Sequence, residues 1–308
     1  MKTIKIHEVG PRDGLQMEEK TVPTSQKIDW IKKLAASGVD YVQIGSFVHP
    51  KYVPQMADTD DLFRYFNQPE NKLNNVVLSG LVLNEKGFER GMACGVDMFC
   101  MGVSASETHS NKNTRMGVDE ALERIVAVAK LAHGAGKQVQ LSVQSAFGCG
   151  YEGPISEDQV LRIVQNYLDN GFYNVSLADT AGHANPQQVK RLFEKVAALD
   201  DKLELTGHFH NTYAMAIANC YAALEAGVQT LESSFAGLGG CPFTSVAGGN
   251  VSTEDLVHML QRMGMRPEIN LDVINEVARS ASQFFNRELP GMIYKTGTIE
   301  QQVTATNK

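Results

Sequence analysis

The most restrictive feature of this sequence is a strand–helix rhythm that repeats along almost the whole chain. Short apolar runs rich in β-branched residues alternate with longer segments whose apolar residues recur at helical spacing. We predict strands at Thr3–Val9, Tyr41–Ser46, Asn75–Leu81, Met98–Val103, Gln138–Val143, Asn174–Leu177, Leu203–Phe209 and Thr230–Ser234. We predict helices between them at Ser25–Ala36, Asp58–Phe66, Glu85–Ala93, Val118–His133, Ser156–Asn170, Pro186–Ala198 and Tyr213–Ala226.

This alternation indicates a parallel sheet whose strands are joined by helical crossovers. About eight repeats in 308 residues favour a closed (β/α)8 TIM barrel over an open doubly wound sheet. No GxGxxG motif follows the first strand, so the main support for a dinucleotide-binding fold is missing. Extra C-terminal helices are predicted at Thr253–Met263 and Val273–Phe285. We therefore predict one catalytic domain over residues 1–290 and a tail over residues 291–308.

Composition and charge narrow the class of protein. A hydrophobic content of 43% and a charged content of 20% are typical of a soluble globular chain. The net charge of −7 argues against a nucleic-acid-binding protein. No apolar run approaches the ~20 residues of a membrane span, and the chain enters a strand too early for a signal peptide. The five cysteines form no CxxC pair, which indicates reduced thiols in a cytoplasmic protein.

Candidate metal ligands lie where three of the predicted strands end, the usual place for chemistry in such a barrel. Arg12 and Asp13 follow the first strand, and an ion-paired turn is their alternative explanation. His208 and His210 lie two residues apart on the seventh strand, so both rings share a face. Strand eight closes onto strand one, which brings Asn250 close to them. These donors suit Mg²⁺ or Mn²⁺, and Co²⁺ or Zn²⁺ also accepts them.

Two further groups lie beyond the eighth strand. Glu254 stands at a helix start, where it either orients Asn250 or a metal-bound water, or serves as an N-terminal helix charge. The glycine-rich segment Ala236–Phe243 carries Cys241, whose thiol can act as a general acid or base. An unreactive buried cysteine is the alternative. A phosphate-binding loop is less well supported, because no Lys-Ser/Thr pair follows the glycines.

Six segments carry motifs in a fixed order along the chain: Glu8–Gln16, Ser46–Lys51, Ser104–Glu107, Asp179–Gly182, Gly237–Pro242 and Gly249–Leu256. Each motif alone is weakly specific, whereas their order along one chain is strongly specific. Taken in this order, they resemble the motifs of the hydroxymethylglutaryl-CoA lyase family, which belongs to the Arg-Asp-Glu barrel (DRE-TIM) metallolyases. The resemblance extends from about Ile6 to Met263.

The resemblance implies a metal-dependent carbon–carbon lyase that cleaves 3-hydroxy-3-methylglutaryl-CoA, or a similar 3-hydroxyacyl-CoA, to acetyl-CoA and a keto acid. It also implies a role in leucine degradation and a homodimer. Arg12 would stabilise the enolate oxygen, His208 or a metal-bound water would act as the base, and Cys241 would protonate the product enolate. The implied metal ligands are Asp13, His208, His210 and Asn250. The implied substrate-binding residues are Arg12, Gln16, Lys20, Gln43 and Asp179.

Two positions depart from the family pattern. The family's glutamate on the second strand falls at Gln43, whose amide can hydrogen-bond Arg12 but cannot take a proton or balance its charge. The first-loop lysine that meets CoA falls at Glu19, so Lys20 would have to replace it. Two alternatives follow: a related lyase, aldolase or Claisen-type enzyme with another hydroxy acid or acyl-CoA, and a non-catalytic barrel that only binds ligands. The intact metal ligands, Arg12 and Cys241 argue against the second.

Overall fold

The barrel predicted from the strand–helix rhythm is present. The computed structural model describes residues 4–240, 248–299 and 301–302. Eight parallel strands close into a barrel in sequence order, because β8 pairs with β1 from Lys5 opposite Thr230 to Glu8 opposite Ser233. The strands are β1 (Lys5–Glu8), β2 (Tyr41–Ser46), β3 (Val77–Leu81), β4 (Met98–Ser104), β5 (Gln138–Gln144), β6 (Asn174–Asp179), β7 (Glu204–Phe209) and β8 (Thr230–Ser233).

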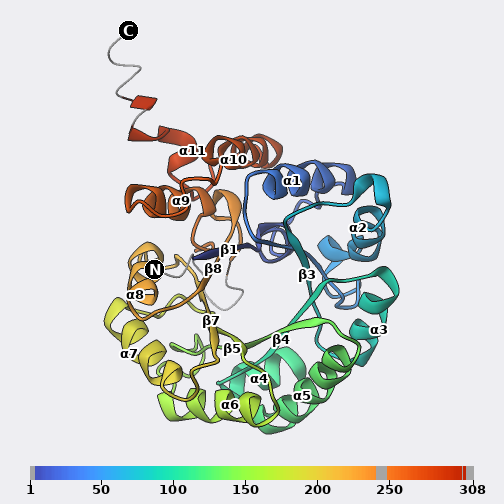
Figure 1. The fold of residues 1–308 in the computed structure, drawn as a ribbon, viewed down its shortest axis with the longest axis vertical. Coiled ribbons are helices and arrows are strands. Elements are labelled where there is room, and N and C mark those ends of the chain that lie inside the picture. Colours follow the sequence, from blue (N-terminus) through green and yellow to red (C-terminus); the bar gives the residue numbers. More distant parts are fainter. Residues whose placement is uncertain (1–3, 241–247, 300, 303–308) are drawn as a thin grey trace.

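The helices form a ring around these strands (Figure 1). They are α1 (Thr24–Ala36), α2 (Thr59–Phe66), α3 (Glu85–Cys94), α4 (Glu107–Thr114), α5 (Val118–Gly134), α6 (Glu157–Asp169), α7 (Pro186–Ala197), α8 (Ala216–Glu225), α9 (Thr253–Arg262), α10 (Leu271–Phe285) and α11 (Ile293–Thr296). Short turns of other helix types are η1 (Gly10–Gly14), η2 (Pro54–Met56), η3 (Pro69–Asn71) and η4 (Phe235–Gly237). None of the helices in the described ranges is long and apolar enough to cross a membrane.

Two differences from the predicted elements have local causes. Helix α8 begins at Ala216 rather than Tyr213, because Ala214 has a left-handed backbone with φ 61° and Asn211 Oδ1 accepts the backbone N–H of Ala216. Helix α4 was not predicted at all. Its sequence ETHSNKNT is polar throughout and lacks the apolar periodicity that identifies a helix. Its start is stabilised by Ser106, whose hydroxyl accepts the backbone N–H of His109.

The two faces of the strands differ in polarity. Large apolar side chains such as Ile6, Ile44 and Leu141 are fully buried within the hydrophobic core. The barrel interior instead carries buried polar side chains, which cost free energy unless they are hydrogen-bonded. Gln140 accordingly donates to Thr206 across the interior at 3.3 Å. The barrel interior therefore contains polar side chains that are oriented by hydrogen bonds to one another.

The C-terminal helices complete the ring on the side where the barrel closes. Helix α10 contacts both α1 and α9 (Figure 1). The indole of Trp30 on α1 donates to Ser280 Oγ on α10 at 2.9 Å. Helix α11 lies within the predicted tail, yet Tyr294 is buried and Asp255 Oδ1 accepts the backbone N–H of Ile293 at 2.8 Å. The first residues of that predicted tail are thus packed against the barrel.

Candidate active site

Asp13, His208 and His210 form a buried cluster whose potential ligand atoms all lie within 4.8 Å of one another. Asp13 Oδ2 lies 3.9 Å from His208 Nε2 and 3.8 Å from His210 Nε2. The two Nε2 atoms are 3.1 Å apart. The predicted convergence of the ends of β1 and β7 is therefore present, with both imidazoles on one face of β7 and its continuation.

The turn after β1 brings Asp13 to this position. In η1 the Val9 carbonyl accepts the backbone N–H of Asp13 at 2.7 Å. Gly10 is required here, because a Cβ would lie 2.4 Å from the ring of Phe235.

The buried Glu8 carboxylate accepts from the backbone N–H groups of Gly10 and Phe235 and from the Thr253 hydroxyl. Burial raises the pKa of Glu8 to about 7, although these three hydrogen bonds act to lower it. Glu8 thus joins the first strand to the segments after β8.

Asn250 reaches the same cluster from beyond β8. Its amide nitrogen donates to Asp13 Oδ2 at 2.8 Å and to the Leu238 carbonyl at 3.1 Å. Its buried Oδ1 has no hydrogen-bond partner among the described residues. A half-turn of the amide would point that oxygen at the Asp13 carboxylate, an arrangement that requires a cation between the two acceptors. The residues present therefore fit a divalent cation held by one carboxylate, two imidazoles and one amide oxygen.

The charges in the cluster also suit a cation. Burial alone would raise the pKa of Asp13. The positive charges of Arg12 and then of the two histidines outweigh burial and lower this pKa to about 2. Burial, followed by repulsion from His208, lowers the pKa of His210 to about 4. At neutral pH the cluster thus offers an ionised carboxylate and a neutral imidazole, the forms in which these side chains bind metals.

A second acid, Glu232 on β8, was missed by the sequence analysis. Its Oε2 lies 2.8 Å from His208 Nδ1, and its Oε1 lies 3.4 Å from His7 Nδ1. Burial opposes the charge of Glu232, but the bonds to His208 and then His7 hold its pKa well below the usual range. Burial likewise lowers the pKa of His208, yet the bond to Glu232 outweighs it and the net shift is upward. The available signal was an acidic residue within a short buried strand.

Three of the predicted substrate-binding residues, Arg12, Gln16 and Gln43, lie near the cluster: Arg12 and Gln16 contact Asp13, and Gln43 contacts Arg12. The Arg12 Nε donates to Gln43 Oε1, and its Nη1 donates to Asp13 Oδ1 at 2.5 Å. Gln16 Nε2 donates to the same Asp13 oxygen at 3.1 Å. Gln43 therefore makes the hydrogen bond to Arg12 that its amide permits, without adding a negative charge.

Asp179 lies at the end of β6, beside β7. It is fully buried, and its Oδ1 accepts the backbone N–H of Ala184 at 3.1 Å. Its Oδ2 has no hydrogen-bond partner within the described ranges. Burial raises the pKa of this carboxyl to about 7, against hydrogen bonds from backbone amides and the charge of His208. Asp179 can thus exchange a proton near neutral pH.

Two other predicted residues contact structural elements instead of the cluster. Lys20 donates to the Phe284 carbonyl at 2.6 Å, and its ammonium lies 3.9 Å from the centre of the Phe284 ring on α10. Glu254 Oε2 accepts the backbone N–H of Ala236 at 2.9 Å, so it supports η4. Burial, followed by repulsion from Asp255, raises the pKa of Glu254 to about 8. Cys241, the predicted proton donor, lies outside the described residues.

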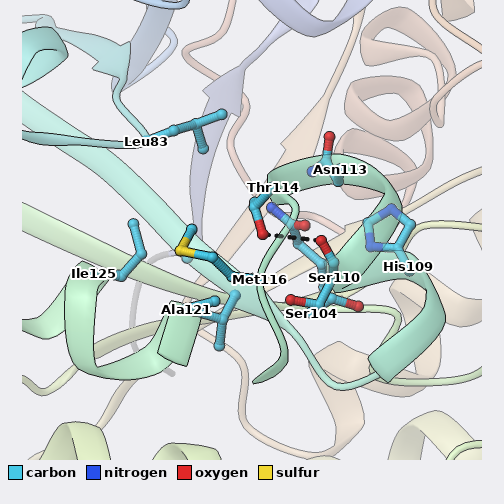
Figure 2. Close-up of a pocket in the computed structure, with 12 residues that line it drawn as sticks. Leu83, Ser104, His109, Ser110, Asn113, Thr114, Met116, Ala121 and Ile125 are labelled. Atoms are coloured by element: carbon cyan, nitrogen blue, oxygen red, sulfur yellow. Dashed lines mark hydrogen bonds between the residues drawn. The ribbon is translucent and has the colours of Figure 1, made fainter. Parts of the chain in front are cut away.

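Two cavities lie apart from the cluster. The first, between the end of β4 and helices α4 and α5, has apolar side chains on one side and polar ones on the other (Figure 2). Its volume of about 10 Å³ suffices for roughly one water molecule, so it cannot hold an acyl substrate. The second, about 430 Å³, lies where α7 begins, beside His183 and Arg191. Asp13, His208 and His210 line neither cavity.

Comparison with known proteins identifies the family to which this site belongs. The model of the HMGL-like family matches residues 3–280. The chain belongs to the HMGL-like family. A hydroxymethylglutaryl-CoA lyase from Pseudomonas mevalonii is 38% identical to this HMGL-like chain over 277 residues, which cover 90% of this chain and 91% of that protein.

Two further relatives agree with this assignment. A 3-hydroxy-3-isohexenylglutaryl-CoA/hydroxymethylglutaryl-CoA lyase from Pseudomonas aeruginosa is 37% identical and covers 89% of this HMGL-like chain and 90% of its own. A solved HMG-CoA lyase from Acinetobacter baumannii, in complex with coenzyme A and 3-methylmalate, superposes with a TM-score of 0.90. It is 36% identical, and the match covers 96% of each chain. This HMGL-like protein is therefore an enzyme, a carbon–carbon lyase built on a (β/α)8 barrel.

Proposed function

We propose that this HMGL-like enzyme cleaves 3-hydroxy-3-methylglutaryl-CoA to acetyl-CoA and acetoacetate with the help of a divalent cation. The observation that carries the proposal is the buried cluster of Asp13, His208 and His210 beside Arg12. The relatives support it, because those described above are lyases of this substrate by name. The bound coenzyme A and 3-methylmalate of the Acinetobacter lyase support an acyl-CoA substrate with a hydroxy acid portion.

The cation would be held by Asp13, His208, His210 and Asn250. When bound, it would supply Lewis acidity that lowers the pKa of the substrate hydroxyl. The Arg12 guanidinium, fixed between Gln43 and Asp13, is placed to stabilise negative charge on the thioester oxygen.

The bond changes then follow from the chemistry of a 3-hydroxyacyl thioester. The C3 hydroxyl loses its proton, the C2–C3 bond breaks, C3 becomes the ketone of acetoacetate, and the electron pair forms the enolate of acetyl-CoA. Asp179, with its pKa of about 7 and an Oδ2 that has no partner among the described residues, receives the hydroxyl proton. His208, to which the resemblance gives this role, is less suited to it, because its Nδ1 faces Glu232 and its Nε2 faces the cluster. A proton from Cys241 to C2 completes acetyl-CoA.

The test is acetyl-CoA release from 3-hydroxy-3-methylglutaryl-CoA by the purified enzyme. We expect release with Mg²⁺ or Mn²⁺, loss of release with a chelator, and recovery when either ion is added back. No release in the presence of bound ion would overturn the substrate but leave the lyase class intact.

The alternatives from the sequence analysis have less support. The named relatives are all lyases of hydroxymethylglutaryl-CoA, which weighs against a barrel that only binds ligands. The Pseudomonas aeruginosa relative is also named for 3-hydroxy-3-isohexenylglutaryl-CoA, so a 3-hydroxyacyl-CoA with another acyl group is the main alternative substrate. A panel of 3-hydroxyacyl-CoAs and free hydroxy acids, assayed with the same enzyme, compares these options directly. Cytoplasmic location, participation in leucine degradation and a homodimer stay predictions.

A further inference from the structure

Glu232 lies on the opposite side of the His208 ring from the metal cluster. Its Oε2 contacts Nδ1 at 2.8 Å, whereas Nε2 of the same ring lies 3.1 Å from His210 Nε2 and 3.9 Å from Asp13 Oδ2. Both partners are buried, and β7 and β8 pair His208 directly with Glu232. The contact is therefore set by strand register as well as by side-chain conformation.

The chemistry of the contact selects one tautomer of the ring. An ionised carboxylate can only accept a hydrogen bond, so the proton of a neutral His208 must reside on Nδ1. Nε2 then carries a lone pair directed at the cluster. With the opposite tautomer, Nε2 would present a proton to the cluster and could not ligate a cation.

A second histidine approaches Glu232 from its other side. His7 on β1 lies opposite Glu232 in the pairing of β1 with β8, and its Nδ1 is 3.4 Å from Glu232 Oε1. The His7 Nε2 forms a 2.8 Å hydrogen bond with Ser79 Oγ on β3. His7 and Ser79 are fully buried, so the order Ser79, His7, Glu232, His208 runs across the barrel interior without solvent.

We propose that Glu232 is a positioning residue of the metal centre, which holds His208 with its proton on Nδ1 and thereby directs the Nε2 lone pair toward the cation. The inference rests on the proposed binding of a divalent cation by Asp13, His208 and His210. When a residue that orients a ligating histidine in this way is removed, the affinity for the metal typically falls about 10- to 100-fold.

The first experiment determines the tautomer in the wild-type, metal-free protein. Nitrogen-15 NMR of labelled histidines, recorded at alkaline pH where the His208 ring is neutral, distinguishes a protonated from an unprotonated ring nitrogen. A His208→Gln variant assigns the signals. We expect the proton on Nδ1, and finding it on Nε2 would overturn the inference whether or not any Glu232 variant folds.

The second experiment measures the affinity for Mn²⁺ alone, from the signal of free Mn²⁺ in electron paramagnetic resonance. Glu232→Leu removes the acceptor, so we expect binding about 10- to 100-fold weaker than in the wild type. Glu232→Gln retains an acceptor oxygen, so its affinity should lie between those of Glu232→Leu and the wild type. The control is Thr206→Val on β7, the strand that carries His208. It removes the buried hydrogen bond that Gln140 on β5 donates to Thr206, and it should bind Mn²⁺ normally.

Wild-type affinity in a folded Glu232→Leu variant would contradict the inference. Neither measurement uses the substrate, so the outcome is independent of the cleavage assay. If the wild type cleaves 3-hydroxy-3-methylglutaryl-CoA but the Glu232 variants bind Mn²⁺ normally, only the role of Glu232 fails. If Mn²⁺ binding depends on Glu232 but no cleavage occurs, only the proposed substrate fails.

Discussion

The guanidinium of Arg12 donates its Nε–H to the amide of Gln43 rather than to a carboxylate. Within the part of the chain that the structure describes, Arg12 forms an ion pair with one carboxylate, that of Asp13, which also belongs to the candidate metal-binding cluster. The positive charge of Arg12 is therefore neutralised less than it would be between two carboxylates. More of its electrostatic attraction is available to a negatively charged substrate oxygen.

We predict that Gln43→Leu slows cleavage of 3-hydroxy-3-methylglutaryl-CoA about tenfold or more. Without the Gln43 oxygen the buried Nε–H loses its partner, and an unsatisfied donor costs about 1–3 kcal/mol. Gln43→Glu keeps an acceptor and should stay within about tenfold of the wild-type kcat/KM, since one strong hydrogen bond replaces another. Steady-state kinetics of the wild type and the two variants measure these effects on kcat/KM. A Gln43→Leu variant with wild-type kcat/KM would show that Gln43 does not position Arg12.

Asp13→Asn should abolish binding of Mg²⁺ or Mn²⁺. The substitution removes the ionised carboxylate that would ligate the cation and leaves only neutral ligands beside the positive charge of Arg12. Titration calorimetry or metal content after gel filtration measures the loss. Asp58→Asn is the matched control, because it removes the negative charge of a partly buried ion pair with Lys27 on α1 and leaves the cluster intact. Metal retained by Asp13→Asn would place the ion elsewhere.

Cys241→Ser should reduce turnover by about 10²- to 10⁴-fold, the usual size of a general acid–base contribution. A serine hydroxyl is a much weaker acid than a thiol, so protonation of the enolate slows while binding of the cation is unaffected. Rapid-quench kinetics together with Mn²⁺ titration separate these two effects. Equal turnover in the two proteins would remove Cys241 from the mechanism.

The buried Glu254 makes stability depend on pH. Its pKa is about 8 in the folded protein against an ordinary 4.5, so between these values the native state binds more protons than the unfolded chain. The contribution of Glu254 to the free energy of unfolding therefore falls as pH rises from about 4.5 to 8 and levels off above that. Glu8 and Asp179, both near 7, contribute in the same direction.

Glu254→Gln keeps an oxygen for the Ala236 amide but removes this titration, so the unfolding free energy should decline less over the same pH window. Chemical denaturation at several pH values measures the slope. Glu120→Gln, at an exposed position on α5, should retain the wild-type slope. An unchanged slope in Glu254→Gln would mean that this carboxyl is not protonated in the folded enzyme.

The sequence was sufficient to predict features that depend on local pattern and on barrel closure. Alternation on one strand placed His208 and His210 together, and the closure of β8 on β1 brought Asp13 near Asn250. It was insufficient where a contact depends on register or on the packing of a distant helix. Glu232 contacts His208 because their strands pair at that residue, and no local motif encodes this pairing.

Lys20 illustrates the second limit. Its ammonium lies over the ring of Phe284, which is 264 residues later in the chain. The position of α10 follows from how Trp30, Ser280 and Phe284 pack together, and not from the sequence around Lys20.

The hydrogen bond between Asp13 and Asn250 joins residues 237 positions apart. During synthesis on the ribosome, the first ligand emerges long before the last, and no shorter N-terminal fragment contains the complete set. The proposed cation could therefore bind only after residue 250 has been made and the barrel has closed. Since it would bind the closed barrel and not the open chain, its binding would also stabilise newly folded enzyme.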